Sequence, residues 1–146
     1  MDAASQTVLQ DVFRRASRSL LQYVHEAYPW VSDQDRDMLA QLDKLIAEER
    51  HAAVRLADYL RRHRIALPYL GSYPNFFTTI NYVSLDRLLP LLAQHQRRAI
   101  ADLERDVTRV RDPEVRVEVD KMLGLTRRHL ETLDHLTSAQ AHIPAA

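Results

Sequence analysis

The chain has 146 residues, of which 46% are hydrophobic and 27% are charged, a composition typical of one globular domain with its own core. Its 20 basic and 20 acidic residues are interspersed, which argues against nucleic acid as a partner, because phosphate binding needs a concentrated basic face. The absence of cysteine excludes disulfides, thiolate metal sites and cysteine nucleophiles.

The first ten residues contain no basic segment followed by an apolar run, so the sequence predicts no secretory signal. No apolar run approaches the roughly 18 residues that a membrane-spanning helix needs. We therefore expect a cytoplasmic protein that has no membrane partner.

Residues 6–28 predict the first helix, which Pro29 is expected to end, because the residue before a proline is pushed out of helical geometry. One face of this helix is apolar and the other is polar. The apolar face consists of Leu9, Val12, Phe13, Ala16, Leu20, Tyr23 and Ala27. The side chains expected to point away are Arg14, Arg15, Arg18, Gln22 and His25.

Residues 32–63 predict a long second helix without glycine or proline, and Ser32 with Asp35 resembles a capping box at its start. Its apolar stripe is formed by Leu42, Leu45, Ile46, Ala52, Ala53, Leu56 and Leu60. Glu49 breaks this pattern, because it falls near the centre of the stripe. A carboxylate at such a position is costly unless it is paired, hydrogen-bonded or bound to a metal.

Residues 64–84 show no helical stripe and contain Pro68, Gly71 and Pro74 together with several aromatic residues. At roughly 3.3 Å per residue this segment can return along the whole second helix. It is therefore predicted to be a long crossover packed on the other helices. A disordered loop is the alternative, although disordered segments are poor in aromatic residues.

The third and fourth helices are predicted over residues 84–110 and 113–141. Ser84 is the expected N-cap of the third, and Asp112-Pro113 is a typical start for the fourth. His95 and Gln96 fall inside the apolar stripe of the third helix, and Thr126 and His129 fall on that of the fourth. The predicted fold is all-α, a single domain over residues 1–146. Short connections and one crossover between the second and third helices define its four-helix bundle.

This layout resembles the ferritin-like superfamily, which includes rubrerythrins and bacterioferritins. In that family two helices each give a carboxylate and two give a Glu-x-x-His pair, all directed at a di-iron site. The spacing in Glu48-x-x-His51 matches that motif. By helical phase, however, Glu48 lies about 100° and His51 about 160° from the centre of the stripe. We therefore expect His51 to face solvent and Glu49 to be the inward carboxylate.

The remaining family positions also differ. Thr126 stands three residues before His129 where the family has a glutamate, and Gln96 stands where it has a carboxylate. A di-iron site needs several carboxylates, and this core supplies one. The resemblance therefore implies a reduced metal site.

Depth along the helices places Glu49, His95, Gln96, Thr126 and His129 near one level. One interpretation is a single Fe, Mn or Zn ion held by Glu49, His129 and His95, with Gln96 beside them, which would support iron and oxygen chemistry. Another is a buried hydrogen-bonded cluster, with Glu49 paired to His129, in a non-catalytic structural or protein-interaction module. A third places the functional site on another surface, such as the aromatic crossover, as a docking face for a protein partner. The expected partners are thus another protein or further copies of the chain in a homo-oligomer. Whether the chain is an enzyme stays open at this point.

Overall fold

The computed structural model describes residues 1–27 and 31–141, and its regular elements there are five α-helices and two short 3₁₀-helices. The α-helices are α1 (Ala3–Ser17), α2 (Leu20–Ala27), α3 (Arg36–Arg62), α4 (Leu85–Arg109) and α5 (Pro113–Ala141). The 3₁₀-helices are η1 (Asp33–Asp35) and η2 (Asn75–Ile80). The all-α prediction is confirmed. Within the ranges described, none of the helices combines the length and hydrophobicity that crossing a membrane requires.

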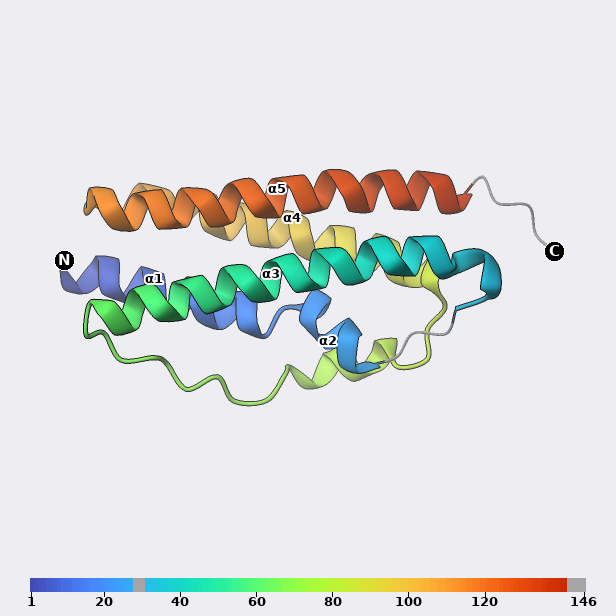
Figure 1. Cartoon of the computed structure of the whole chain (residues 1–146), viewed down its shortest axis with the longest axis horizontal. Coiled ribbons are helices and arrows are strands. Elements are labelled where there is room, and N and C mark those ends of the chain that lie inside the picture. Colours follow the sequence, from blue (N-terminus) through green and yellow to red (C-terminus); the bar gives the residue numbers. More distant parts are fainter. Residues whose placement is uncertain (28–30, 142–146) are drawn as a thin grey trace.

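The helices α1, α3, α4 and α5 run along one long axis, and α2 follows α1 after a short break (Figure 1). The helices α3 and α4 run in one direction, whereas α1 and α5 run in the other. The closest pairing joins α4 to α5, and α1 packs mainly on α3. The chain returns from the end of α3 to the start of α4 along the outside of the helices.

The first predicted helix is not continuous, because it breaks at Arg18 and Ser19. Arg18 ends α1 with non-helical backbone angles, and its guanidinium Nε donates to the carbonyl of Gly71, 2.9 Å away. The Ser19 hydroxyl then accepts a hydrogen bond from the backbone N–H of Gln22 at 3.2 Å, which caps the start of α2. The prediction of one helix over 6–28 was therefore wrong at this point, and its expected end at Pro29 lies outside the described residues.

The first helix starts at Ala3, earlier than predicted, and the starts predicted for the other three helices are present within a few residues. The Ser32 hydroxyl and backbone N–H both contact Asp35 Oδ2, at 3.1 and 3.3 Å, so the capping box forms, although it precedes η1 rather than α3 directly. Asp112 Oδ1 accepts from the N–H groups of Glu114 and Val115 at 2.9 and 3.2 Å. Ser84 occupies the N-cap position of α4, but its hydroxyl contacts Asp86 instead of capping the backbone.

The connection between α3 and α4 packs along the helices, as predicted for a crossover. Phe77 and Ile80 of η2 are buried, and Gln10 Nε2 donates to the Ala66 carbonyl at 2.8 Å. The backbone of Gly71 has φ +67°, a conformation that residues with a side chain rarely adopt. Arg18 therefore holds the chain at the one glycine of this segment.

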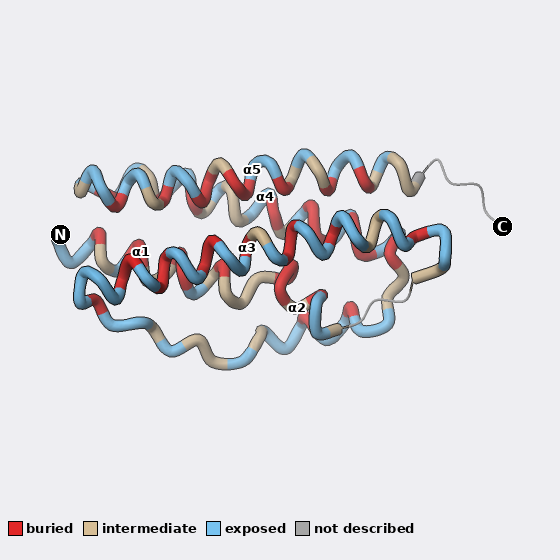
Figure 2. Tube along the Cα trace, in the orientation of Figure 1, coloured by how far each residue is buried: buried red, intermediate tan, exposed pale blue. Residues whose placement is uncertain are grey.

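The buried residues lie on the inward faces of the helices (Figure 2) and form two hydrophobic clusters along the long axis. One cluster joins α1 to the second half of α3 and the first half of α5. The other joins α2 and η2 to the first halves of α3 and α4 and the end of α5. Among the described residues, six of the eight buried polar ones belong to α2, α3, α4 and α5: Gln22, Glu49, Gln96, Asp106, Thr126 and His129.

Candidate functional site

Glu49 is buried, with 7% of its surface exposed, and His51 is exposed, so the helical phase predicted for α3 is confirmed. One carboxylate oxygen of Glu49, Oε1, receives two hydrogen bonds from the start of α2. The Ser19 hydroxyl donates at 2.5 Å and Gln22 Nε2 donates at 2.9 Å. Gln22 Nε2 also donates to the Ile46 carbonyl at 2.9 Å. The break between α1 and α2 is therefore tied to the middle of α3.

Burial raises the pKa of Glu49 to about 7, because a low-dielectric interior disfavours the ionised carboxylate. The hydrogen bonds from Ser19 and Gln22 act in the opposite direction, since they stabilise the charge. Both donors are neutral groups, so they solvate the carboxyl group without balancing its charge. The carboxyl group of Glu49 thus carries a proton at mildly acidic pH.

His129, the predicted partner of Glu49, is even more deeply buried, with 2% of its surface exposed. The two side chains do not pair with each other. Its Nε2 lies 3.3 Å from Oε2 of Glu48, whose side chain is 39% exposed. Burial lowers the pKa of His129, and the nearby Glu48 carboxylate opposes that shift. The expected Glu49–His129 contact is therefore replaced by a contact with the preceding glutamate.

A cavity of about 260 Å³ lies beside Glu49 at the α1–α2 break, and it brings together most of the predicted cluster. Glu49, His95, Gln96 and Thr126 all line it, whereas His129 does not. Thr126 donates within its own helix, to the Met122 carbonyl at 2.7 Å, and so takes no part in a network with Glu49.

Gln96 is buried and its Nε2 is enclosed without a hydrogen-bond partner among the described residues. An amide left unpaired in this way costs about 1–3 kcal/mol of folding free energy. Such a cost calls for an explanation in terms of packing or of a bound molecule.

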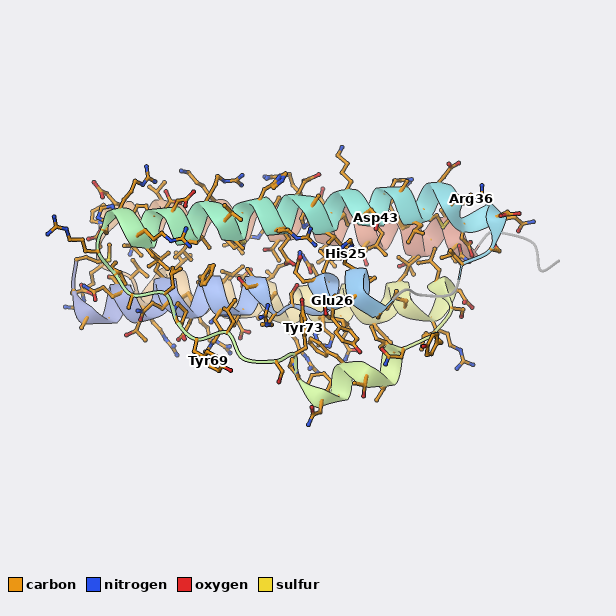
Figure 3. All side chains as sticks on the ribbon, turned by 60° about the horizontal axis from the view of Figure 1, so that its bottom comes forward. His25, Glu26, Arg36, Asp43, Tyr69 and Tyr73 are labelled. Carbon is orange, nitrogen blue, oxygen red and sulfur yellow. The ribbon has the colours of Figure 1, made fainter. Side chains whose placement is uncertain are left out.

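His95 lies between the cavity and the aromatic side chains of the crossover. Its ring stacks on Phe76, with centroids 6.1 Å apart, and meets the edge of Phe77 at 5.5 Å. Burial and the neighbouring Arg98 both lower the pKa of His95. Figure 3 shows the crossover beside α2, with Tyr73 next to Glu26 and Tyr69 on the outer side.

The four residues predicted to surround a metal are thus only partly assembled. In the part of the chain that the structure describes, no three histidine or carboxylate side chains come together as metal ligands would. The Glu48-x-x-His51 pair is also divided, because Glu48 reaches His129 while His51 faces solvent.

Sequence reasoning missed Ser19 and Gln22 as partners of Glu49, and it placed Gln22 on the solvent side. Gln22 is in fact buried, and it lies in α2 directly after the break that ends α1. The signal that could have revealed this is the pair Ser19-x-x-Gln22, which has the spacing of a capping box and marks a helix start.

Comparison of the chain with protein-family models, with curated proteins and with solved structures finds no match. The function is therefore inferred from the residues and their geometry.

Proposed function

We propose that this protein is a ferritin-like helical bundle that serves as a structural or protein-interaction module, in which the buried polar groups fix helix packing. The single observation that carries this proposal is the pair of hydrogen bonds from Ser19 and Gln22 to one oxygen of Glu49. These bonds join two helices at the point where one of them breaks. A buried polar cluster of this kind specifies how helices pack, even where it adds little to stability.

The helix directions support the ferritin-like part of the proposal. A long connection leads from α3 to α4, which run in the same direction, and short connections join the remaining neighbours (Figure 1). A bundle with one crossover has this order of directions. The broken first helix is a departure from four continuous helices.

Exposed aromatic side chains support an interaction role. Tyr69 and Tyr82 of the crossover are 92% and 82% exposed, and Phe76 is 58% exposed. Aromatic residues are enriched where proteins contact one another. A second copy of the chain or another protein would bury these side chains.

A second candidate is a site for one Fe, Mn or Zn ion. The observation that favours it is that Glu49, His95 and Gln96 line one cavity. A carboxylate and an imidazole suit these ions, and His129 would have to leave Glu48 to become a further ligand. Such an ion would supply Lewis-acid or redox chemistry.

Metal analysis of protein purified without chelators separates the two candidates, together with calorimetric titration of Fe²⁺, Mn²⁺ and Zn²⁺. The structural proposal expects no stoichiometric metal and no saturable heat. It also expects Glu49→Gln to fold normally, because an amide oxygen can still accept from Ser19 and Gln22. One ion per chain that disappears in both Glu49→Gln and His95→Ala would overturn the proposal in favour of the metal site.

A further inference from the structure

The cavity beside Glu49 has the size and lining of a small-molecule site. Its volume of about 260 Å³ lies just below the range for such sites, about 300–1,000 Å³, and suits a small ligand. Most of its wall is apolar, with Leu92, Leu103 and Met122 among the lining residues and Phe77 contributed by the crossover. All five α-helices and η2 contribute to it, so a molecule inside would contact every layer of the protein.

The polar lining offers hydrogen bonds that the protein does not use. Gln96 is 5% exposed, and its amide Nε2 makes no hydrogen bond with any residue in the described ranges. A glutamine amide can present either its donor or its acceptor, because a half-turn about the last bond exchanges them. Glu49 lines the same cavity, and only its Oε1 is engaged by Ser19 and Gln22.

The charges around the cavity disfavour a charged occupant of either sign. Arg15, Arg18 and Arg98 line its more exposed part, where Asp102 is the one acidic residue among the described lining residues, so the excess positive charge opposes a cation. In its ionised form, the buried Glu49 carboxylate opposes an anion in the same cavity. A neutral molecule avoids both penalties, because it brings no uncompensated charge into the interior.

We propose that this cavity binds a small neutral molecule with an apolar body and one carboxamide or carbonyl group, which hydrogen-bonds to the Gln96 amide. The apolar body occupies the space between Leu92, Leu103 and Met122. The inference does not depend on the ferritin-like arrangement, and it is compatible with a bundle that carries no metal.

Four probes of similar size test this proposal: benzamide, toluene, benzoate and benzylamine. Binding to the isotope-labelled full chain is measured by NMR titration of backbone amides. Benzamide is expected to shift the amides of residues 92–103 and 122–126 saturably. It should bind about fivefold more tightly than toluene, because one ordinary hydrogen bond changes a dissociation constant by about that factor. It should also bind more tightly than either charged probe.

Two variants locate the site and the contact. Gln96→Leu should abolish the preference for benzamide over toluene, whereas Gln94→Leu, at an exposed neighbouring position, should retain it. Ala99→Leu, which introduces a larger side chain into the wall, should weaken all four probes. If Ala99→Leu fails to fold, the shift map of the wild-type chain still identifies the site.

The proposal is overturned if no probe shifts those amides saturably, which would indicate a cavity filled by water alone. It is also overturned if benzamide keeps its preference in Gln96→Leu, or if benzoate or benzylamine binds most tightly. None of these outcomes bears on the metal titrations, so this inference and the proposed function can fail separately.

Discussion

Glu49 and His129 are both buried in the middle of the molecule, but their polar groups are satisfied in different ways. Glu49 receives two hydrogen bonds from neutral donors of a neighbouring helix, Ser19 and Gln22. His129 has one longer contact, to the half-exposed Glu48. The two adjacent glutamates of α3 therefore belong to separate sites, one enclosed by the α1–α2 break and one open to solvent. Two adjacent residues on a helix point in different directions, and this difference is enough to give their carboxylates different partners and different dielectric environments.

The largest expected effect comes from removing the enclosed carboxylate. At pH 5, Glu49→Ala should lower the free energy of unfolding by about 3 kcal/mol, because it extends the cavity and leaves the donors of Ser19 and Gln22 unpaired. Glu48→Ala should cost about 1 kcal/mol, since its contact is long and half-exposed. Urea denaturation measures both. Equal losses would show that the two sites do not differ as described.

The enclosed site should also make stability depend on pH. The folded-state pKa of Glu49, about 7, exceeds the ordinary value of 4.5, so between these values the folded chain holds a proton that the unfolded chain releases. The contribution of Glu49 protonation to the free energy of unfolding is complete below pH 4.5 and is lost as the pH rises through about 7. The free energy of unfolding should change by roughly 3 kcal/mol over this range. The comparison of wild type with Glu49→Gln isolates this contribution, because the variant does not titrate. Parallel pH profiles for the two proteins would contradict it.

His129 should act in the opposite direction and more weakly. Its folded-state pKa is lowered, so below the ordinary histidine value of 6.5 the unfolded chain binds the proton more readily and stability falls with falling pH. His129→Leu should therefore gain stability relative to wild type between pH 8 and pH 5. The exposed His135 provides the control, and His135→Leu should show no such change. A relative stability of His129→Leu that is constant with pH would be the contrary result.

The smallest effect concerns the unpaired amide of Gln96, which lines the cavity beside Glu49. Gln96→Leu should raise the free energy of unfolding by about 1 kcal/mol, because it replaces an unsatisfied buried amide by an apolar side chain of similar size. Gln94→Leu is the matched exposed substitution and should leave stability unchanged. Thermal denaturation of the two variants compares them directly. A clear loss in Gln96→Leu alone would mean that the amide has a partner in solution.

The phase of α3 could be predicted from sequence because one uninterrupted helix fixes every position by its 3.6-residue repeat. The burial of Glu49 and the exposure of His51 followed from that repeat. The same repeat failed on the first helix, where it placed Gln22 on the solvent side. Leu20 and His25 after the break keep their predicted sides, but Gln22 does not. A pattern of apolar residues does not record where such a break falls.

Partner choice was harder to predict than burial. The sequence could place Glu49, Gln96 and His129 at one depth, but depth does not say which neighbour a side chain reaches. Glu48 contacts His129 because a glutamate side chain can extend from a flank of the helix toward the adjacent one. Such reach depends on the distance between helices, which no single helix encodes.

The crossover has one further consequence. Its exposed stretch around Tyr69 has little regular structure, and side-chain bonds from Gln10, Arg18 and Tyr23 anchor its backbone or side chains to the first two helices. A protease cut at this stretch would divide the chain into a piece with α1, α2 and α3 and a piece with α4 and α5. Each hydrophobic cluster draws residues from both pieces, so the nicked halves would remain associated as a complementing pair.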